Sequence, residues 1–224
     1  MGASSGLPRP RRPRGSLSRD LILDAAESVA STDGPAALTV RAVAADLGAA
    51  PMAIYRYFAT KEELLNALLD RVLGRFVPQP ASGDWVDDLR RFAHAHRRLL
   101  DQHAWALAAF FSHPSPGPNA TRVGEFALEI LSRAPLDRRR AVAVFSGLLA
   151  LNYGWSAFSS ARNVQPEQAA EQVRQALRRL LPLDYPHTAA VAGDMAEYGS
   201  DVHYALVLEL LLAGVQGAAS AARD

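Results

Sequence analysis

The chain has 224 residues, of which 49% are hydrophobic and 21% are charged. This balance is ordinary for a folded protein of one large domain or two modest ones. The chain contains no cysteine, which excludes disulfides, thiolate zinc sites and cysteine nucleophiles and fits a cytoplasmic location. The formal net charge is only +1, so the distribution of charge along the chain says more about partners than the total does.

The N-terminal segment is strongly basic. Residues 1–19 contain no acidic residue and five arginines, namely Arg9, Arg11, Arg12, Arg14 and Arg19. Residues 1–17 are predicted to form a disordered arm, whose arginines can lie along DNA phosphates. A solvated tail explains the same composition equally well, so the sequence leaves both interpretations open. No apolar run follows the arginines, which argues against a secretory signal.

Residues 18–61, the head, are predicted to form three helices, because their apolar residues recur with helical spacing. Residues that favour helix ends bound the first two helices: Ser18 and Gly34 the first, Thr39 and Gly48 the second. Pro51 suits the start of the third, which is predicted to run through Phe58. The last two helices have the proportions of a helix-turn-helix, whose second helix enters the DNA major groove. Thr60 and Glu63 then form a capping box that opens a connecting helix, assigned to residues 62–76.

The remaining residues, 84–217, are predicted to form a helical body beyond a loop at 78–83. Helical periodicity predicts helices over 84–101, 102–112, 119–134, 137–162, 166–181 and 199–217, with a short helix after Pro186. No run alternates convincingly between apolar and polar side chains. The predicted fold class is therefore all-α, with an N-terminal three-helix helix-turn-helix domain followed by a C-terminal helical domain.

One stretch of the body has the length of a membrane span. Residues 141–161 carry no charged side chain, and such a run can cross a bilayer. It also contains several serines, two glycines and Asn152, and no second span accompanies it. We interpret it as a helix that protein buries on several faces and predict no membrane association.

Residues 38–70 read LTVRAVAADLGAAPMAIYRYFATKEELLNALLD. This segment resembles the DNA-binding domain of the TetR family of bacterial repressors, whose pattern is roughly T-x-R-x-[VIL]-A-x-x-L-G-V-x-x-x-x-[LIV]-Y-x-[HY]-F-x-x-K-x-x-L. One departure is Ala50, where the family often has a capping Ser or Thr before the recognition helix. The closing segment, LDYPHTAAVAGDMAEYGSDVHYALVLELLLAG, resembles the C-terminal domain of the tetracycline-repressor-like branch less specifically.

The resemblance implies a set of DNA-binding residues. Thr39 caps a helix and touches phosphate, Arg41 reads a guanine edge, Met52, Ala53 and Arg56 lie on the recognition surface, and Tyr55, Tyr57 and Lys61 hold the DNA backbone. Apart from the resemblance, exposed tyrosines beside an arginine suit phosphate contacts. Lys61 is the only lysine of the chain and lies at a helix start, which favours phosphate. A simple solvated charge is the alternative interpretation of Lys61.

Two apolar helices of the body point to assembly. Small residues at spacings of four and three form a stripe on helix 137–162, made of Ala143, Gly147, Ala150, Gly154, Ala157 and Ala161. The last helix carries Ala205, Leu208 and Leu212 on one face. In proteins that resemble the TetR family, two late helices pair with those of a second subunit as a four-helix bundle. The resemblance therefore implies a homodimer through these residues, and packing within one chain is the alternative.

The body also carries residues suited to a small-molecule pocket, which needs apolar walls and a few polar groups. The candidates are His96, Trp105, Phe110, Phe145, Asn152 and Trp155, although each of them alone could equally be a core residue. His94, His96 and His103 do not share one tight metal-ligand face, so no metal and no other cofactor is predicted.

The favoured interpretation is a homodimeric repressor that binds a palindromic operator in double-stranded DNA and is released by a small apolar or aromatic effector. One alternative is a constitutive or architectural DNA-binding protein without an effector. A second alternative is an α-helical enzyme or small-molecule-binding protein. No Ser/His/Asp order, paired-carboxylate site, P-loop or GxGxxG motif supports an enzyme, so the chain is predicted not to be one.

Overall fold

The computed structural model describes residues 17–112, 117–160, 166–179 and 184–220, and all regular structure in these ranges is helical. This confirms the predicted all-α class. The chain divides into two compact units. The first unit comprises Met1–Arg75 with Trp105–Thr121, and the second comprises Phe76–Ala104 with Arg122–Asp224. Each unit is described by itself below.

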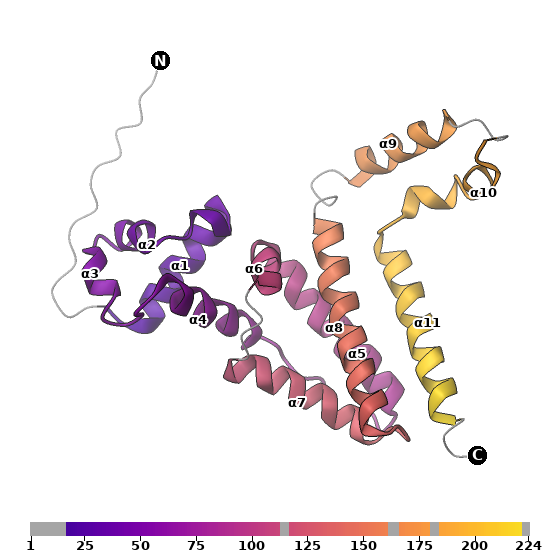
Figure 1. Ribbon diagram of the computed structural model, residues 1–224, viewed down its shortest axis with the longest axis horizontal. Helices are drawn as coiled ribbons and strands as arrows, with labels where there is room; N and C mark the ends of the chain where they lie inside the picture. The colour runs from indigo at the N-terminus through magenta and orange to yellow at the C-terminus, as the bar shows by residue number, and fades with distance from the viewer. Residues whose placement is uncertain (1–16, 113–116, 161–165, 180–183, 221–224) are drawn as a thin grey trace. The chain divides into compact units, whose positions relative to one another are not determined.

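The first unit contains the head and begins with four α-helices (Figure 1). Their bounds are α1 Arg19–Asp33, α2 Val40–Asp46, α3 Pro51–Ile54 and α4 Lys61–Leu73, with a short 3-10 helix, η1, at Pro35–Ala37. The predicted N-caps are confirmed, because the hydroxyls of Ser18, Thr39 and Thr60 accept the backbone N–H groups of Leu21, Ala42 and Glu63 at 3.2, 3.0 and 3.0 Å. Helix α3 ends at Ile54, before the predicted end at Phe58, and a turn follows it.

The core of the first unit joins these four helices with residues from further along the chain. Its fully buried side chains include Ile22, Leu38, Ile54, Phe58, Leu64 and Leu68. Ala106 and Ala109, from η2 (Ala104–Ala106) and α6 (Leu107–Ser112), belong to the same cluster. Trp105 and Phe110 also pack against it. This corrects their predicted place in the interior of the body, since the segment around them packs with the head.

The second unit is built around α5 (Trp85–Gln102), which packs against α8 (Arg138–Ser160) and α11 (Asp201–Ser220). The other helices are α7 (Pro118–Ser132), whose first turn belongs to the first unit, α9 (Pro166–Arg178), α10 (Pro186–Ala190) and the 3-10 helix η3 (Asp194–Glu197). Buried side chains of α5, α7, α8 and α11 form its core, including Leu89, Phe92, Leu131, Leu148 and Tyr204.

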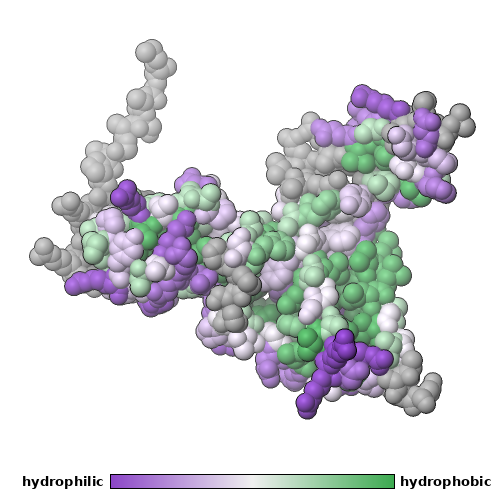
Figure 2. All heavy atoms as spheres, viewed as in Figure 1, coloured by the Kyte–Doolittle hydropathy of each residue, from purple (hydrophilic) through white to green (hydrophobic). Residues whose placement is uncertain are grey.

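Helices α8 and α11 are both long and apolar enough to cross a membrane by length and composition, yet about four-fifths of each apolar stretch lies outside the buried core. Only Leu148, Asn152, Ser156 and Ser159 of α8 are buried. The prediction that protein buries this helix on several faces is therefore wrong for the single chain. Figure 2 shows the result as a broad apolar surface over α8 and α11.

The exposed residues of these two helices differ in part from those predicted for an interface. Ala143, Ala150, Gly154 and Ala205 are exposed, and Gly147 and Ala157 are half-buried. Ala161 lies outside the described residues. Leu208 and Leu212 are buried within the chain, so they cannot face a partner, and Leu206 and Leu210 are exposed in their place.

Candidate nucleic-acid interface

The turn between α2 and α3 sets the geometry of the helix-turn-helix. Gly48 has a φ of 64°, in the left-handed region that favours glycine. The backbone N–H groups of Gly48 and Ala49 donate to the carbonyls of Ala45 and Ala44 at 3.1 and 2.8 Å, which is a Schellman C-cap. The chain can then reverse directly into Pro51, and the buried Ile54 anchors α3 to the core. The predicted motif is confirmed in its turn and in the presence of both helices, although α3 is shorter than predicted.

Most residues that the resemblance assigns to DNA contact lie on the surface of the first unit. The exposed members are Thr39, Arg41, Met52, Tyr55, Arg56 and Lys61, whereas Ala53 and Tyr57 are half-buried. Met52 is the extreme case, because 73% of this apolar side chain is exposed in the first turn of α3. An apolar side chain presented at the start of a recognition helix suits contact with a thymine methyl group.

The described part of the chain does not neutralise the charge of this surface. Arg41, Arg56 and Lys61 have no ion-pair partner among the residues that the structure describes. Other arginines of the same unit are ion-paired: Arg19 with Glu63, Arg71 with Asp24 and Arg75 with Glu27. Cations without a carboxylate partner are available to phosphates, whose neutralisation releases counterions and drives DNA binding.

Tyr57 differs from its predicted role. Its hydroxyl donates to the backbone carbonyl of Leu17 at 2.7 Å, and its own carbonyl accepts from the Arg19 guanidinium at 2.5 Å. The only hydroxyl proton of Tyr57 is thus used within the chain, so this group cannot donate to a DNA phosphate as it stands. Sequence reasoning missed the contact because its partners lie about forty positions away, with no local pattern that connects them.

Two of the predicted pocket residues of the second unit, His96 and Asn152, belong to a buried hydrogen-bond network. The Asn152 amide nitrogen donates to the Ala93 carbonyl at 2.9 Å and lies 3.1 Å from His96 Nδ1. The Tyr204 hydroxyl donates to the Asn152 side-chain oxygen at 2.7 Å. Asn152 is fully buried, so its polar atoms are satisfied by the protein and do not face a cavity.

The ionisation of this network follows from its burial. Burial lowers the pKa of His96 to about 4 and raises the pKa of Tyr204 to about 12. His96 is therefore neutral at pH 7 and accepts through Nδ1, which agrees with the amide donor of Asn152. Phe145 and Trp155 are half-buried, and the buried indole nitrogen of Trp155 has no hydrogen-bond partner among the described residues.

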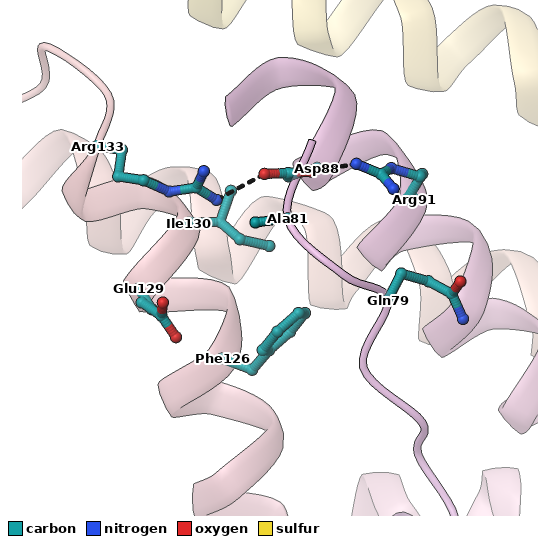
Figure 3. Close-up of a pocket in the computed structure, with 8 residues that line it drawn as sticks. All are labelled: Gln79, Ala81, Asp88, Arg91, Phe126, Glu129, Ile130 and Arg133. Atoms are coloured by element: carbon teal, nitrogen blue, oxygen red, sulfur yellow. Dashed lines mark hydrogen bonds and ion pairs between the residues drawn. The ribbon is translucent and has the colours of Figure 1, made fainter. Parts of the chain in front are cut away.

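The second unit also has two hollows, and the second of them is lined in part by Ala143 and Gly147 of the predicted interface. One, of about 30 Å³, lies beside Asp88 and is shown in Figure 3, where Asp88 contacts both Arg91 and Arg133. Burial raises the pKa of Asp88, but hydrogen bonds from Ser82 and Arg133 outweigh it and lower the pKa to about 2. This hollow has room for about one water molecule. The other is an apolar groove of about 390 Å³ between α8 and α11.

Comparison with known proteins identifies the family. The family model for bacterial regulatory proteins, tetR family, matches residues 22–68, and the model for the tetracyclin repressor-like C-terminal domain matches residues 77–218. An HTH-type transcriptional regulator of Saccharopolyspora erythraea is 32% identical over 209 residues, which cover 91% of this chain and 86% of that protein. The HTH-type transcriptional repressor DrrR1 of Streptomyces coeruleorubidus is 39% identical over 116 residues, covering 50% of this chain and 43% of that protein.

Solved structures agree with this fold. SCO7222, a TetR from Streptomyces coelicolor, is 26% identical with a TM-score of 0.78, covering 90% of this chain and 98% of that chain. ActR of Streptomyces coelicolor, in complex with actinorhodin, is 24% identical with a TM-score of 0.80, covering 91% and 97%. The chain therefore belongs to the TetR family of bacterial transcriptional regulators, and its first four helices carry the family's helix-turn-helix DNA-binding domain.

Proposed function

We propose that the protein is a cytoplasmic, homodimeric repressor that binds a palindromic DNA operator and leaves it when a small apolar or aromatic effector binds. The observation that carries the proposal is a group of exposed cations around a helix-turn-helix, Arg41, Arg56 and Lys61, which have no ion-pair partner within the described ranges. Lys61 and Tyr55 hold phosphates, while Arg41 and the exposed face of α3 meet base edges. We propose the domain boundaries that the sequence suggests, except that the segment around Trp105 and Phe110 is assigned to the head, against whose core it packs.

A second copy of the chain is the proposed cover for the apolar surface of α8 and α11. Leu206 is 57% exposed and Leu210 is 73% exposed, and soluble monomers rarely leave large apolar patches open. The exposed small residues of α8 allow close approach of a partner helix, because a Cβ added at Gly147 or Gly154 meets no atom within 4 Å. A four-helix bundle across a two-fold axis would cover both surfaces at once.

The effector is proposed to enter the second unit among its aromatic side chains. His96 stacks on Phe92 with ring centroids 5.8 Å apart, and Trp155 meets Tyr204 edge-on at the same distance. The unpartnered indole N–H of Trp155 offers a donor to a ligand oxygen. Among the relatives in structure, ActR has been solved with actinorhodin and with (S)-DNPA. By analogy, we propose that an aromatic effector opens the Asn152 network of this chain.

Release from DNA requires that the effector prefer a conformation whose heads are wrongly spaced. A coupling of about 1–3 kcal/mol changes operator affinity about 5–150-fold, and operator DNA must weaken effector binding by the same factor. The test is a screen of aromatic compounds by tryptophan emission and by operator release. Compounds that do both support the proposal, whereas a screen in which none does either favours the constitutive regulator without an effector. No catalytic activity is part of the proposal.

A further inference from the structure

The recognition helix α3 is too short to fix its own orientation. It spans only Pro51–Ile54, a single turn (Figure 1). The backbone N–H of Tyr55 closes this turn on the Pro51 carbonyl at 3.4 Å, which is long for a hydrogen bond. Ala50, at the N-cap, supplies no side-chain hydrogen bond. A helix of one turn is not stable by itself, so its direction depends on the contacts that neighbouring elements make with the residues around it.

Arg19, the first residue of α1, supplies such contacts on the C-terminal side of α3. Its guanidinium donates to the backbone carbonyl of Tyr57 at 2.5 Å. The same group lies 4.1 Å from the centre of the ring of Phe58, which is fully buried. A guanidinium over an aromatic face adds a cation–π attraction to the hydrogen bond. Arg19 therefore ties the turn that follows α3 to the start of α1.

The start of α4 joins the same network. Glu63 Oε1 lies 3.5 Å from the Arg19 guanidinium, and Glu63 Oε2 accepts the backbone N–H of Ala59 at 2.8 Å. The Tyr57 hydroxyl donates to the Leu17 carbonyl at 2.7 Å, which adds a second link to the segment that leads into α1. One guanidinium thus connects α1, the turn after α3 and the first turn of α4.

We propose that Arg19 is a positioning residue for operator recognition: it holds the turn after α3 in place and so sets the direction in which Met52 and Arg56 meet base edges. The inference rests on the proposed DNA binding and adds a determinant of sequence discrimination that does not itself touch a base. Hydrogen bonds weaken steeply when their geometry changes, so a small rotation of α3 loses base contacts. The phosphate contact proposed for Lys61 lies on α4 and does not depend on that rotation.

A direct contact between Arg19 and a phosphate is the competing interpretation, because 52% of its side chain is exposed. The charge of Arg19 is already opposed by Glu63, whereas Arg41 and Lys61 have no ion-pair partner within the described ranges. The two roles also differ in what they predict. A phosphate contact adds to the affinity for every sequence and to the salt slope, whereas a positioning residue raises the affinity for the operator relative to other sequences.

The first experiment compares Arg19→Ala with the unaltered full chain. Two duplexes are used, a half-site sequence enriched from random DNA and a scrambled duplex of the same composition, and binding is measured by fluorescence anisotropy over a range of salt concentrations. We expect the affinity of Arg19→Ala for the enriched duplex to fall roughly tenfold, with unchanged affinity for the scrambled duplex and an unchanged salt slope. The control is Arg71→Ala, because Arg71 joins α4 to Asp24 of α1 and not to the turn after α3. It should leave both affinities unchanged.

The matched variant is Glu63→Gln. An amide has one acceptor oxygen where the carboxylate has two, so the variant can serve either the Ala59 N–H or Arg19 but not both. Removal of a negative charge near DNA should raise the affinity for the scrambled duplex. If Arg19 acts through this network, the ratio of the two affinities should nevertheless fall several-fold. The double variant with Arg19→Ala should show the same ratio as Arg19→Ala alone, because both changes break one network.

The thermal unfolding midpoint of each variant is measured first, and binding is compared at a temperature at which all of them are folded. If Arg19→Ala does not fold, the ratio for Glu63→Gln decides: a fall supports the inference and an unchanged ratio overturns it. An equal loss of affinity for both duplexes, with a salt slope lower by about one, would make Arg19 a phosphate contact. In that case, or if the ratio for Arg19→Ala is unchanged, the inference is wrong and the proposed function stands. If the unaltered chain enriches no DNA sequence, the proposed function itself fails.

Discussion

At the residue scale, the proposed DNA binding depends on three cations of the head: Arg41, Arg56 and Lys61. We expect Lys61→Ala to weaken binding to every DNA sequence and to lower the salt slope by about one, because it removes one phosphate contact. Arg41→Ala should instead reduce discrimination among base pairs, with a loss of about 1–3 kcal/mol on the best site. Gel-shift titration at several salt concentrations measures both effects.

The control for these substitutions is an exposed cation of the other unit. Arg98 lies on α5 and is exposed, and Arg98→Ala should leave both the salt slope and the base preference unchanged. If Lys61→Ala and Arg41→Ala also leave both unchanged, the DNA-contacting surface is assigned to the wrong residues.

His96 gives a second prediction at this scale, on the pH dependence of stability. Burial lowers its pKa from 6.5 to about 4 in the folded chain, so the unfolded chain binds the proton first as pH falls. The free energy of unfolding should be unaffected above about pH 6.5 and should decrease by up to about 3 kcal/mol towards pH 4. Urea titrations at pH 7.5, 6 and 5 measure this.

The matched variant is His96→Gln, which keeps an acceptor for Asn152 and cannot be protonated. Its unfolding free energy should vary less with pH across the same window. Asp88 does not affect this comparison. Its pKa is lowered to about 2, so its contribution to the free energy of unfolding is lost only between about pH 4 and pH 2. An equal pH dependence in both proteins would contradict the neutral, buried state of His96.

At the element scale, a carboxylate on one helix caps the start of another within the first unit. Asp70 of α4 accepts the backbone N–H groups of Asn119 and Ala120, in the first turn of α7, at 2.9 and 3.1 Å. It also accepts the Asn119 side-chain amide at 2.9 Å. This carboxylate satisfies free N–H groups and complements the positive end of the helix.

Gly117 makes the capping contact possible. A Cβ at this position would lie 2.2 Å from a carboxylate oxygen of Asp70, so Gly117→Ala must displace the cap. We expect a loss of about 1–3 kcal/mol in the free energy of unfolding, measured by urea denaturation. Gly193→Ala is the control, because its added methyl meets no atom within 4 Å and its φ of −63° suits alanine. Equal stabilities of the two variants would contradict the contact.

The helices and their caps could be predicted because their signals are local. Ser18, Thr39 and Thr60 each bond a backbone group three residues away. The faces of α11 could not be predicted, because residues 202–217 are almost uniformly apolar and an apolar helix without periodicity does not show which side is buried. The predicted interface includes Leu208 and Leu212 for this reason, although both lie in the core.

The DNA-contacting surface could also be predicted only in part, because only its local features leave a signal in the sequence. The exposed cations lie within one continuous segment that carries the family resemblance. The role of Tyr57 depends on Leu17 and Arg19, and the burial of Trp105 and Phe110 against the head depends on packing between distant segments. Contacts of this kind leave no periodic signal in the sequence.

At the scale of the whole molecule, the proposed dimer would link two heads to one operator. Gly154 is exposed, and a side chain placed there meets nothing in its own chain within 4 Å. The Gly154→Arg protein should therefore fold normally, but it should place a long charged side chain in the proposed dimer interface. Light scattering should show a monomer, and operator affinity should fall by about 10²–10⁴-fold because the half-sites are no longer bound together.

The conservative variant Gly154→Ala keeps a small residue in the stripe and should remain dimeric with unchanged operator affinity. A Gly154→Arg protein that folds and remains dimeric would place the interface elsewhere. A protein that partitions into lipid vesicles instead of dimerising would assign the apolar surface of α8 and α11 to a membrane.

The central claim is that the protein binds a palindromic operator as a homodimer. Its most direct test is the selection of bound duplexes from random DNA by the full chain, with the mass of the complex measured by light scattering. The account predicts enrichment of a palindromic sequence and two protomers on each duplex, with half-site centres about one helical turn, or roughly 34–36 Å, apart. Failure to enrich any sequence, or enrichment of a single half-site bound by one protomer, would contradict it.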